Sequence, residues 1–296
     1  MMSSPNVPAR DREPLLFHVA KALERKGIRG SSRMLHSLER LGWLNRPVDY
    51  SIGDAVSILV PIARNGYDRY DLDHYETDFL AALAKAIKQC QGEFTLIDCG
   101  ADIGVISLKL LAICPSITRI IAFEPNSEAF PWLKHNLDRL KIAGEATNAA
   151  VSDFTGSGRL AAPDARFTPG METNHTQYFL EAAADGPIVV TKIDSLLLKA
   201  LGNLALKLDL EGGELAALKG ASRTISGAAN VVVAIEAHPA VTARTGIDPA
   251  ECLRFLASLR PFRFSVSETG LRLDPSKPVF EQVAPEQVYN IICIAE

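Results

Sequence analysis

The stretch Asp98-Cys99-Gly100-Ala101-Asp102-Ile103-Gly104 decides the fold of this 296-residue chain. The apolar run 94–97 before it predicts a buried strand, and residues 105–111 after it predict a helix with an apolar face. A strand, a glycine-punctuated turn and a helix form the opening unit of a doubly wound nucleotide-binding sheet. Glycine permits the tight turn and lets a ligand approach the backbone closely.

Two carboxylates, Asp98 and Asp102, distinguish this turn from a dinucleotide site. Dinucleotide sites have the spacing Gly-x-Gly-x-x-Gly and aim helix amides at a pyrophosphate, whereas the spacing here is Gly-x-x-x-Gly. Two unit charges about 4 Å apart interact by roughly 4 kcal/mol at an effective dielectric near 20, and beside a pyrophosphate this interaction is repulsive. The turn therefore favours S-adenosylmethionine, which carries a positive sulfonium and a positive ammonium group, over NAD. The alternative is an ordinary strand–helix turn with surface aspartates.

A second buried strand, predicted at 119–123, ends in Glu124. This acid follows the glycine turn at roughly the twenty-residue spacing at which the architecture places a ribose-binding carboxylate. Carboxylate oxygens can accept hydrogen bonds from both hydroxyls of a ribose diol. Glu124 is therefore predicted to bind the cofactor, and the alternative is a solvated acid at a strand end.

Strands and helices alternate through most of the chain, which predicts an α/β fold with a parallel sheet and right-handed crossovers. The predicted core strands lie near 94–98, 119–123, 145–150, 204–210 and 231–236. Three further strands are expected to close the sheet, at 262–266, 271–273 and 288–294.

Two predicted domains divide the chain: an N-terminal α+β cap at 1–74 and a core at 75–296. The cap should contain two short helices between about 13 and 44 and a hairpin at 48–62. Between 153 and 187 the alternation breaks down. Long irregular segments inside compact domains are often lids or binding loops.

Composition excludes several classes of partner. The net charge is -4, and the chain lacks the clustered basic face that nucleic-acid binding needs. Five scattered cysteines without CxxC spacing predict reduced thiols. No apolar run is long enough to span a bilayer, and the first residues lack an apolar leader. We expect a cytoplasmic protein without nucleic-acid or membrane partners.

Polar residues also lie at the ends of two later predicted strands, 204–210 and 231–236. The first strand places Asp209 at the carboxyl edge of the sheet, where ligands bind in open α/β folds. The second places Glu236 and His238 at the same edge. Asp209, Glu236 and His238 are therefore the predicted catalytic residues. His238 has the unperturbed pKa closest to neutrality and is the better candidate base, with Asp209 as the second candidate. Asp209, Glu236 and His238 could also hold a divalent ion, although no dedicated metal site is predicted.

Three more charged residues of this region have open interpretations. Glu211 reaches the same edge as Asp209. Glu214 falls in the first turn of the next helix, where an acid suits the helix dipole, and this structural role is preferred. Lys207 alternates with leucines, so it is either exposed or directed toward the site.

Six segments, in order, resemble the FkbM-type S-adenosylmethionine-dependent methyltransferases over about residues 75–239. The matching segments are Asp98-x-Gly100-Ala101-x-Ile103-Gly104, Phe123-Glu124-Pro125, Ala150-Val151-Ser152-Asp153, Ile193-Asp194-Ser195-Leu196, Leu206-Lys207-Leu208-Asp209-Leu210-Glu211-Gly212-Gly213-Glu214 and Ile235-Glu236-x-His238-Pro239.

The resemblance implies a class I methyltransferase fold, a doubly wound and mostly parallel seven-stranded sheet with an antiparallel last strand. It also implies methylation of hydroxyl groups on sugars, lipids or polyketide-like products. The family usually has Asn where this chain has Asp102, which adds a charge and lacks the amide donor. The expected cofactor contacts lie at the first turn, at the second strand end and near two later strand ends: Asp98, Gly100, Ala101, Asp102, Gly104, Glu124, Ser152, Asp153 and Asp209.

These observations predict an S-adenosylmethionine-dependent O-methyltransferase with a small-molecule, glycan or lipid acceptor. The expected reaction is an in-line displacement whose rate depends largely on positioning the acceptor oxygen. We expect the cap and residues 153–187 to cover the acceptor side of the site. The alternatives are a methyltransferase-like binding module without catalysis and, less favoured, an NAD-dependent oxidoreductase. The sequence does not indicate the oligomeric state.

Overall fold

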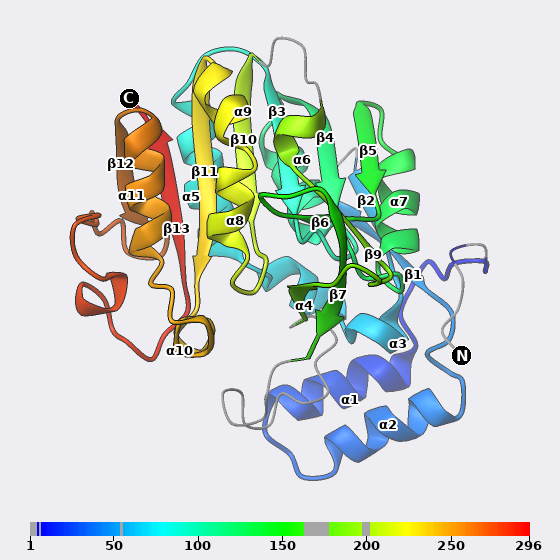
Figure 1. The fold of residues 1–296 in the computed structure, drawn as a ribbon. Helices are drawn as coiled ribbons and strands as arrows, with labels where there is room; N and C mark the ends of the chain where they lie inside the picture. Colours follow the sequence, from blue (N-terminus) through cyan, green and yellow to red (C-terminus); the bar gives the residue numbers. More distant parts are fainter. Residues whose placement is uncertain (1–4, 6, 54–55, 163–177, 197–201) are drawn as a thin grey trace.

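The fold is built around a seven-stranded mixed sheet with the strand order β12–β13–β11–β10–β3–β4–β5 (Figure 1). The computed structural model describes residue 5 and residues 7–53, 56–162, 178–196 and 202–296. The sheet strands are β3 (Phe94–Cys99), β4 (Ile117–Phe123), β5 (Ala143–Thr147), β10 (Asn203–Leu208), β11 (Asn230–Ala237), β12 (Phe262–Val266) and β13 (Tyr289–Ala295).

Pairing within this sheet is parallel from β11 through β10, β3 and β4 to β5. Only β13 runs antiparallel to its neighbours, β11 and β12. The central strands β3 and β10 are buried almost throughout, as expected for parallel strands covered on both faces. The predicted doubly wound, mostly parallel seven-stranded fold is therefore confirmed.

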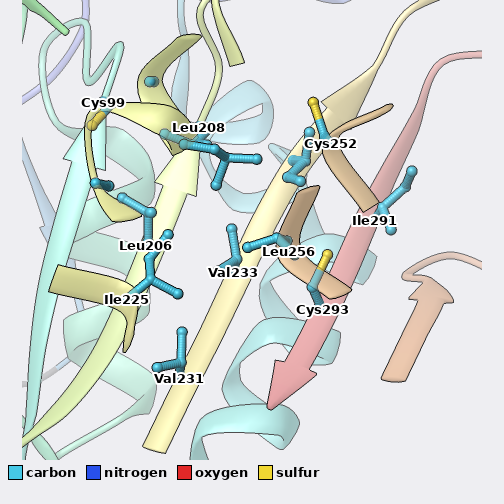
Figure 2. Close-up of a cluster of buried hydrophobic side chains, with 14 of the residues drawn as sticks. Cys99, Leu206, Leu208, Ile225, Val231, Val233, Cys252, Leu256, Ile291 and Cys293 are labelled. Carbon is cyan, nitrogen blue, oxygen red and sulfur yellow. The ribbon is translucent and has the colours of Figure 1, made fainter. Parts of the chain in front are cut away.

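Helices cover both faces of the sheet. On one face, α8 (Glu214–Lys219), α9 (Ser222–Gly227) and α11 (Ala250–Leu259) pack on apolar side chains of β10, β11 and β13, and Figure 2 shows this cluster around Leu206, Val233 and Leu256. On the other face lie α5 (Thr77–Lys88), α6 (Val105–Ile113) and α7 (Phe130–Asp138). None of the helices in the described ranges is long and apolar enough to cross a membrane.

A separate four-stranded sheet accounts for part of the predicted irregular segment. Its strands are β6 (Ala150–Val151), β7 (Gly156–Ala161), β8 (Phe179–Ala182) and β9 (Ile188–Thr191), in the order β6–β9–β7–β8. The remainder of that segment, 163–177, lies outside the described residues.

Two strand predictions were wrong in detail. The strand predicted at 145–150 is two strands, because β5 ends at Thr147 and β6 joins the smaller sheet. Residues 271–273 form only an isolated bridge between Ser265 and Arg272. Pairing stops there because Asp274 accepts hydrogen bonds in a turn and the following Pro275 has no N–H to donate.

The N-terminal cap contains a helix pair, α1 (Leu15–Arg25) and α2 (Ser31–Arg40), and an antiparallel hairpin of β1 (Val48–Ile52) and β2 (Val56–Val60). Two short helices follow, α3 (Ile62–Asn65) and α4 (Arg69–His74). The cap shares a hydrophobic core with α6 and α7, because Phe17 and Ile58 belong to the same buried cluster as Leu108 and Trp132. The division at residue 74 therefore stays a prediction about sequence organisation, and the packing across it is continuous.

One polar side chain joins the cap to the sheet domain. Asn136 of α7 is fully buried. Its oxygen accepts from the Leu59 amide at 2.8 Å, and its Nδ2 donates to the carbonyl oxygens of Leu59 at 3.1 Å and Ile103 at 2.9 Å. One residue thus satisfies backbone groups of β2 and of the turn that precedes α6.

Replacing Asn136 by Ala should lower the free energy of unfolding by about 2–3 kcal/mol, because it leaves buried backbone groups without partners. Urea or guanidinium unfolding measures the loss. The matched control is Lys134→Ala on the same helix, whose exposed pair with Asp138 should contribute no more than about 0.5 kcal/mol. Equal effects of the two substitutions would contradict the role assigned to Asn136.

Candidate active site

A cavity of about 660 Å³ opens at the carboxyl ends of the central strands. Its wall contains Asp102 after β3, Glu124 after β4, Asp209 after β10 and His238 after β11. Ligands of open α/β sheets bind at this edge, and a volume of roughly 300–1,000 Å³ is typical of small-molecule sites.

The glycine turn is held against its neighbours by backbone contacts. The amides of Gly100 and Ala101 both donate to the carbonyl oxygen of Phe123, at 3.0 and 3.1 Å. Gly100 has φ of +77°, and a Cβ there would lie 1.9 Å from the Asp209 carbonyl oxygen. Only glycine fits this position, and the close approach brings the ends of β3 and β10 together.

Lys207 lies beneath this turn and faces inward, which decides between its two interpretations. Its Nζ lies 3.1 Å from Asp98 Oδ1 and 3.3 Å from Asp209 Oδ2, and it donates to the Gly100 carbonyl oxygen at 2.8 Å. Burial alone would lower the pKa of Lys207, but the carboxylates of Asp98 and Asp209 raise it above its ordinary value. Asp98 is fully buried, accepts from Ser107 Oγ at 2.7 Å and does not line the cavity.

Asp102 is also paired with a base. Its Oδ1 lies 2.6 Å from Arg64 Nη1, and its Oδ2 accepts from Asn65 Nδ2 at 2.8 Å. The sequence argument considered the charges of Asp98 and Asp102 without their partners, and the structure pairs Asp98 with Lys207 and Asp102 with Arg64. The cavity nevertheless keeps an excess of acids, since six acidic and two basic side chains line its described part.

Glu124 is positioned by two backbone amides. One carboxylate oxygen accepts from the Asp102 amide at 2.7 Å and the other from the Asn126 amide at 2.8 Å. Burial raises the pKa of Glu124 to about 7, although the Asn126 amide acts in the opposite direction. Each oxygen of the ionised group keeps acceptor capacity for a further donor from the cavity.

A second acidic group, formed by Asp209, Glu211 and Glu236, lies at the ends of β10 and β11. One carboxylate oxygen from each residue lies within 4.8 Å of the others. Burial, together with Asp209, raises the pKa of Glu211 to about 7 and that of Glu236 well above its ordinary value. Such a group can share a proton or hold a divalent cation with hard oxygen ligands. The cation site suggested from the sequence contained His238, whereas the structure groups Glu211 with the two acids.

His238 faces the cavity but also caps α10 (Pro239–Thr245). Its Nδ1 accepts a hydrogen bond from the Ala240 amide at 3.1 Å. A backbone amide can only donate, so the neutral ring carries its hydrogen on Nε2. Burial lowers the pKa of His238, and Arg244 adds to this effect. The neutral ring therefore has Nε2–H as its remaining polar group, which is a hydrogen-bond donor.

The remaining predicted residues divide between wall and scaffold. Ser152 lines the cavity, whereas Asp153 is exposed outside it and Gly104 lies at the start of α6. Glu214 has the structural role preferred from the sequence, because its Oε1 accepts from the amides of Leu210 at 2.8 Å and Gly212 at 3.2 Å.

Sequence reasoning missed the part of the wall that comes from the N-terminal segment. Arg64, Tyr67, Tyr75 and Glu76 all line the cavity. They follow the predicted hairpin, and no spacing relates them to the glycine turn. Their position depends on how the cap folds back onto α6.

Backbone strain is concentrated at this wall. Among the described residues other than glycine, positive φ occurs at Glu76, Asp102 and Glu211, with values of 51°, 48° and 52°. All three line the cavity. Residues in this conformation cost of order 1 kcal/mol or more and cluster at functional sites.

Comparisons with known proteins identify the family of the chain. A family model described as "Methyltransferase FkbM domain" matches residues 98–263, more than half of the chain. The hexuronic acid methyltransferase AglP of Haloferax volcanii is 25% identical over 179 residues, which cover 59% of this chain and 66% of AglP, just under two thirds of its length.

Solved structures that match the chain include the methyltransferase FkbM from Methylobacillus flagellatus, at 22% identity and a TM-score of 0.43, covering 68% of this chain and 43% of that protein. Precorrin-6y C5,15-methyltransferase from Geobacter metallireducens is 12% identical with a TM-score of 0.40, covering 75% of this chain and 89% of that protein.

The raised pKa of Glu211 predicts how one substitution depends on pH. Above the unfolded pKa of about 4.5, the unfolded chain releases this proton while the folded chain keeps it until about pH 7, so ionisation destabilises the folded state. Glu211→Gln removes this penalty. The melting temperature of the variant, relative to wild type, should rise between pH 5 and pH 8. Thermal melts without ligand measure the difference, and the exposed Glu145→Gln is the control. A difference that is constant with pH would contradict the assignment.

Proposed function

Because the chain belongs to the FkbM methyltransferase family, we propose that it transfers the methyl group of S-adenosylmethionine to a hydroxyl group, most naturally one on a carbohydrate. The observation that carries the proposal is the position of Glu124. Its two oxygens are each fixed by one backbone amide and keep acceptor capacity toward the cavity. A cis-diol such as that of a ribose matches this pair of acceptors.

The charge of the cavity supports the same cofactor. Six acidic side chains and two basic ones line the described wall. A sulfonium and an ammonium group gain from this excess, whereas the pyrophosphate of NAD would be repelled. The oxidoreductase alternative is therefore disfavoured on charge as well as on the glycine spacing.

A carbohydrate acceptor is supported by the relative AglP, which is named for methylation of a hexuronic acid. The smaller sheet contributes Leu160, Leu180 and Ala182 to the same cavity wall, and we propose that the acceptor binds on this side. Lipid and other small-molecule acceptors with hydroxyl groups remain within the same chemistry.

For proton removal we propose Glu236, assisted by Asp209 and Glu211. A carboxylate with a raised pKa is a stronger base than an ordinary one, and burial together with Asp209 raises the pKa of Glu236. One carboxylate oxygen of each of the three acids lies within 4.8 Å of the others. His238, predicted from the sequence as the base, would instead donate its Nε2–H to the acceptor. The direct displacement at the methyl group then depends on holding the acceptor oxygen in line.

The cofactor assignment is tested by calorimetry with S-adenosylhomocysteine and NAD. We expect binding of S-adenosylhomocysteine and none of NAD. Glu124→Gln should weaken the binding of S-adenosylhomocysteine by about 10- to 100-fold, because hydrogen bonds to a charged acceptor contribute about 1.5–3 kcal/mol. The matched control is Glu128→Gln, an exposed acid four residues further along the chain. Binding of NAD without S-adenosylhomocysteine would overturn the proposal.

The proton-removal step is tested with methyl-labelled cofactor and a panel of hydroxylated acceptors that begins with hexuronic acid glycosides. Glu236→Gln should lower kcat by about 10²–10⁴-fold with little change in S-adenosylhomocysteine affinity. His238→Asn keeps an acceptor for the Ala240 amide and should cost less than Glu236→Gln.

Chelation separates the two roles of the acidic group. Activity should survive EDTA if the carboxylates act as a base. Loss of activity that Mg²⁺ restores would show that they hold a cation, and full activity of Glu236→Gln would remove this residue from the mechanism. Binding of S-adenosylhomocysteine without turnover on any acceptor would favour the binding-module alternative.

A further inference from the structure

Arg64 is a charged residue of the cavity wall that has a buried polar atom without a hydrogen-bond partner among the described residues. It lies in α3, only 2% of its side chain is exposed, and it lines the cavity. Its Nη1 lies 2.6 Å from Asp102 Oδ1 and donates to Asn65 Oδ1 at 3.1 Å. Its Nε is buried and has no hydrogen-bond partner among the described residues.

An orphaned N–H on a buried guanidinium points to a partner that is bound from outside the chain. Buried polar groups are nearly always hydrogen-bonded, and each exception calls for a cause. The planar guanidinium offers its donors in a fork that matches the two oxygens of a carboxylate. Asp102 occupies only one side of this fork. The unpaired side is suited to a second anion.

The rest of the wall makes Arg64 the position where an anion would bind. The other base that lines the described part of the cavity is Lys207, and its ammonium is already engaged by Asp98, Asp209 and the Gly100 carbonyl. Only 7% of the Lys207 side chain is exposed, and its charge is already offset by two carboxylates, so it is a poor site for an anionic ligand. Everywhere else the acidic wall would repel a negative group.

We propose that Arg64 binds the carboxylate of the amino-acid moiety of the cofactor. This inference rests on the proposed function, since the carboxylate is the one negative group of S-adenosylmethionine. Asp102 holds the guanidinium in place through the ion pair, and Asn65 fixes the other oxygen of Asp102. Arg64 is then a specificity-determining residue that selects amino-acid-bearing nucleosides over nucleosides with a plain aminoalkyl chain.

This assignment changes the role expected of the N-terminal cap. The sequence suggested that the cap covers the acceptor. Arg64 instead places a cap residue at the cofactor, directly beside Asp102 and close enough to Glu124 to lower its pKa. Cofactor recognition thus uses side chains from both sides of the boundary drawn at residue 74.

The experiment compares two ligands that differ only in the carboxylate: S-adenosylhomocysteine and its decarboxylated analogue, which keeps the nucleoside, the sulfur and the amine. Calorimetry on the full-length wild-type protein should show about 10- to 100-fold tighter binding of S-adenosylhomocysteine. Arg64→Met should weaken the binding of S-adenosylhomocysteine by a similar factor and leave the affinity for the decarboxylated analogue nearly unchanged. Arg64→Lys should retain part of the preference. The matched control is Arg69→Met, a half-exposed arginine of α4 that pairs with Asp73 and does not line the cavity, and it should keep the full preference.

Equal affinity of the wild-type protein for the two ligands would overturn the inference, and this arm needs no variant to fold. A preference that survives Arg64→Met in a protein with a cooperative thermal melt would also overturn it. Arg64→Met that weakens both ligands equally would assign Arg64 a purely structural role. Failure of the wild-type protein to bind either ligand would instead reject the proposed function itself.

Discussion

The site depends on one buried cation, the ammonium group of Lys207. It lies under the glycine turn and is shared by Asp98, Asp209 and the Gly100 carbonyl. A buried charge of this kind is stable only when its partners surround it, so the ends of β3 and β10 are fixed relative to one another. The glycine at position 100 is required by the same constraint, because any side chain would collide with the Asp209 backbone. Because the ends of β3 and β10 are held rigidly, the cavity wall next to them can contain residues with strained backbone and carboxyl groups with raised pKa values.

The sequence predicted the features that depend on local order along the chain. The strand–turn–helix unit, the alternation that makes a doubly wound sheet, and the acids at strand ends are all set by neighbours, and the structure places Glu124, Asp209, Glu236 and His238 on one cavity. The prediction from hydrophobic periodicity was wrong where strand pairing depends on segments that are distant in the sequence. Residues 145–150 belong to two sheets because β6 pairs with β9 rather than with β4.

The partners of charged side chains could not be predicted either, because they too are distant in the sequence. The charges of Asp98 and Asp102 looked free because their partners, Lys207 and Arg64, are far away in the sequence, and Lys207 could equally have been exposed. The role of His238 depended on a single backbone amide: once Ala240 donates to Nδ1, the proton sits on Nε2 and the ring is a donor. Residue types and spacing define which groups reach an edge, but the hydrogen-bond partner decides what each group can do.

The cap and the cavity wall are coupled through packing as well as charge. Phe17 and Ile58 share a core with Leu108 and Trp132, and Asn136 ties β2 to the turn before α6. α6 starts directly after the glycine turn, so the same contacts that stabilise the cap hold the helix that follows this turn. A ligand that contacts Arg64 therefore needs a folded cap in order to bind. Its binding would also stabilise the cap, because a ligand that binds only the folded form shifts the folding equilibrium toward that form by mass action. Deleting the cap would remove Arg64 and at the same time expose the core that the cap shares with α6 and α7. A truncated protein therefore cannot distinguish a loss of ligand recognition from a loss of folding, whereas point substitutions within the cap can.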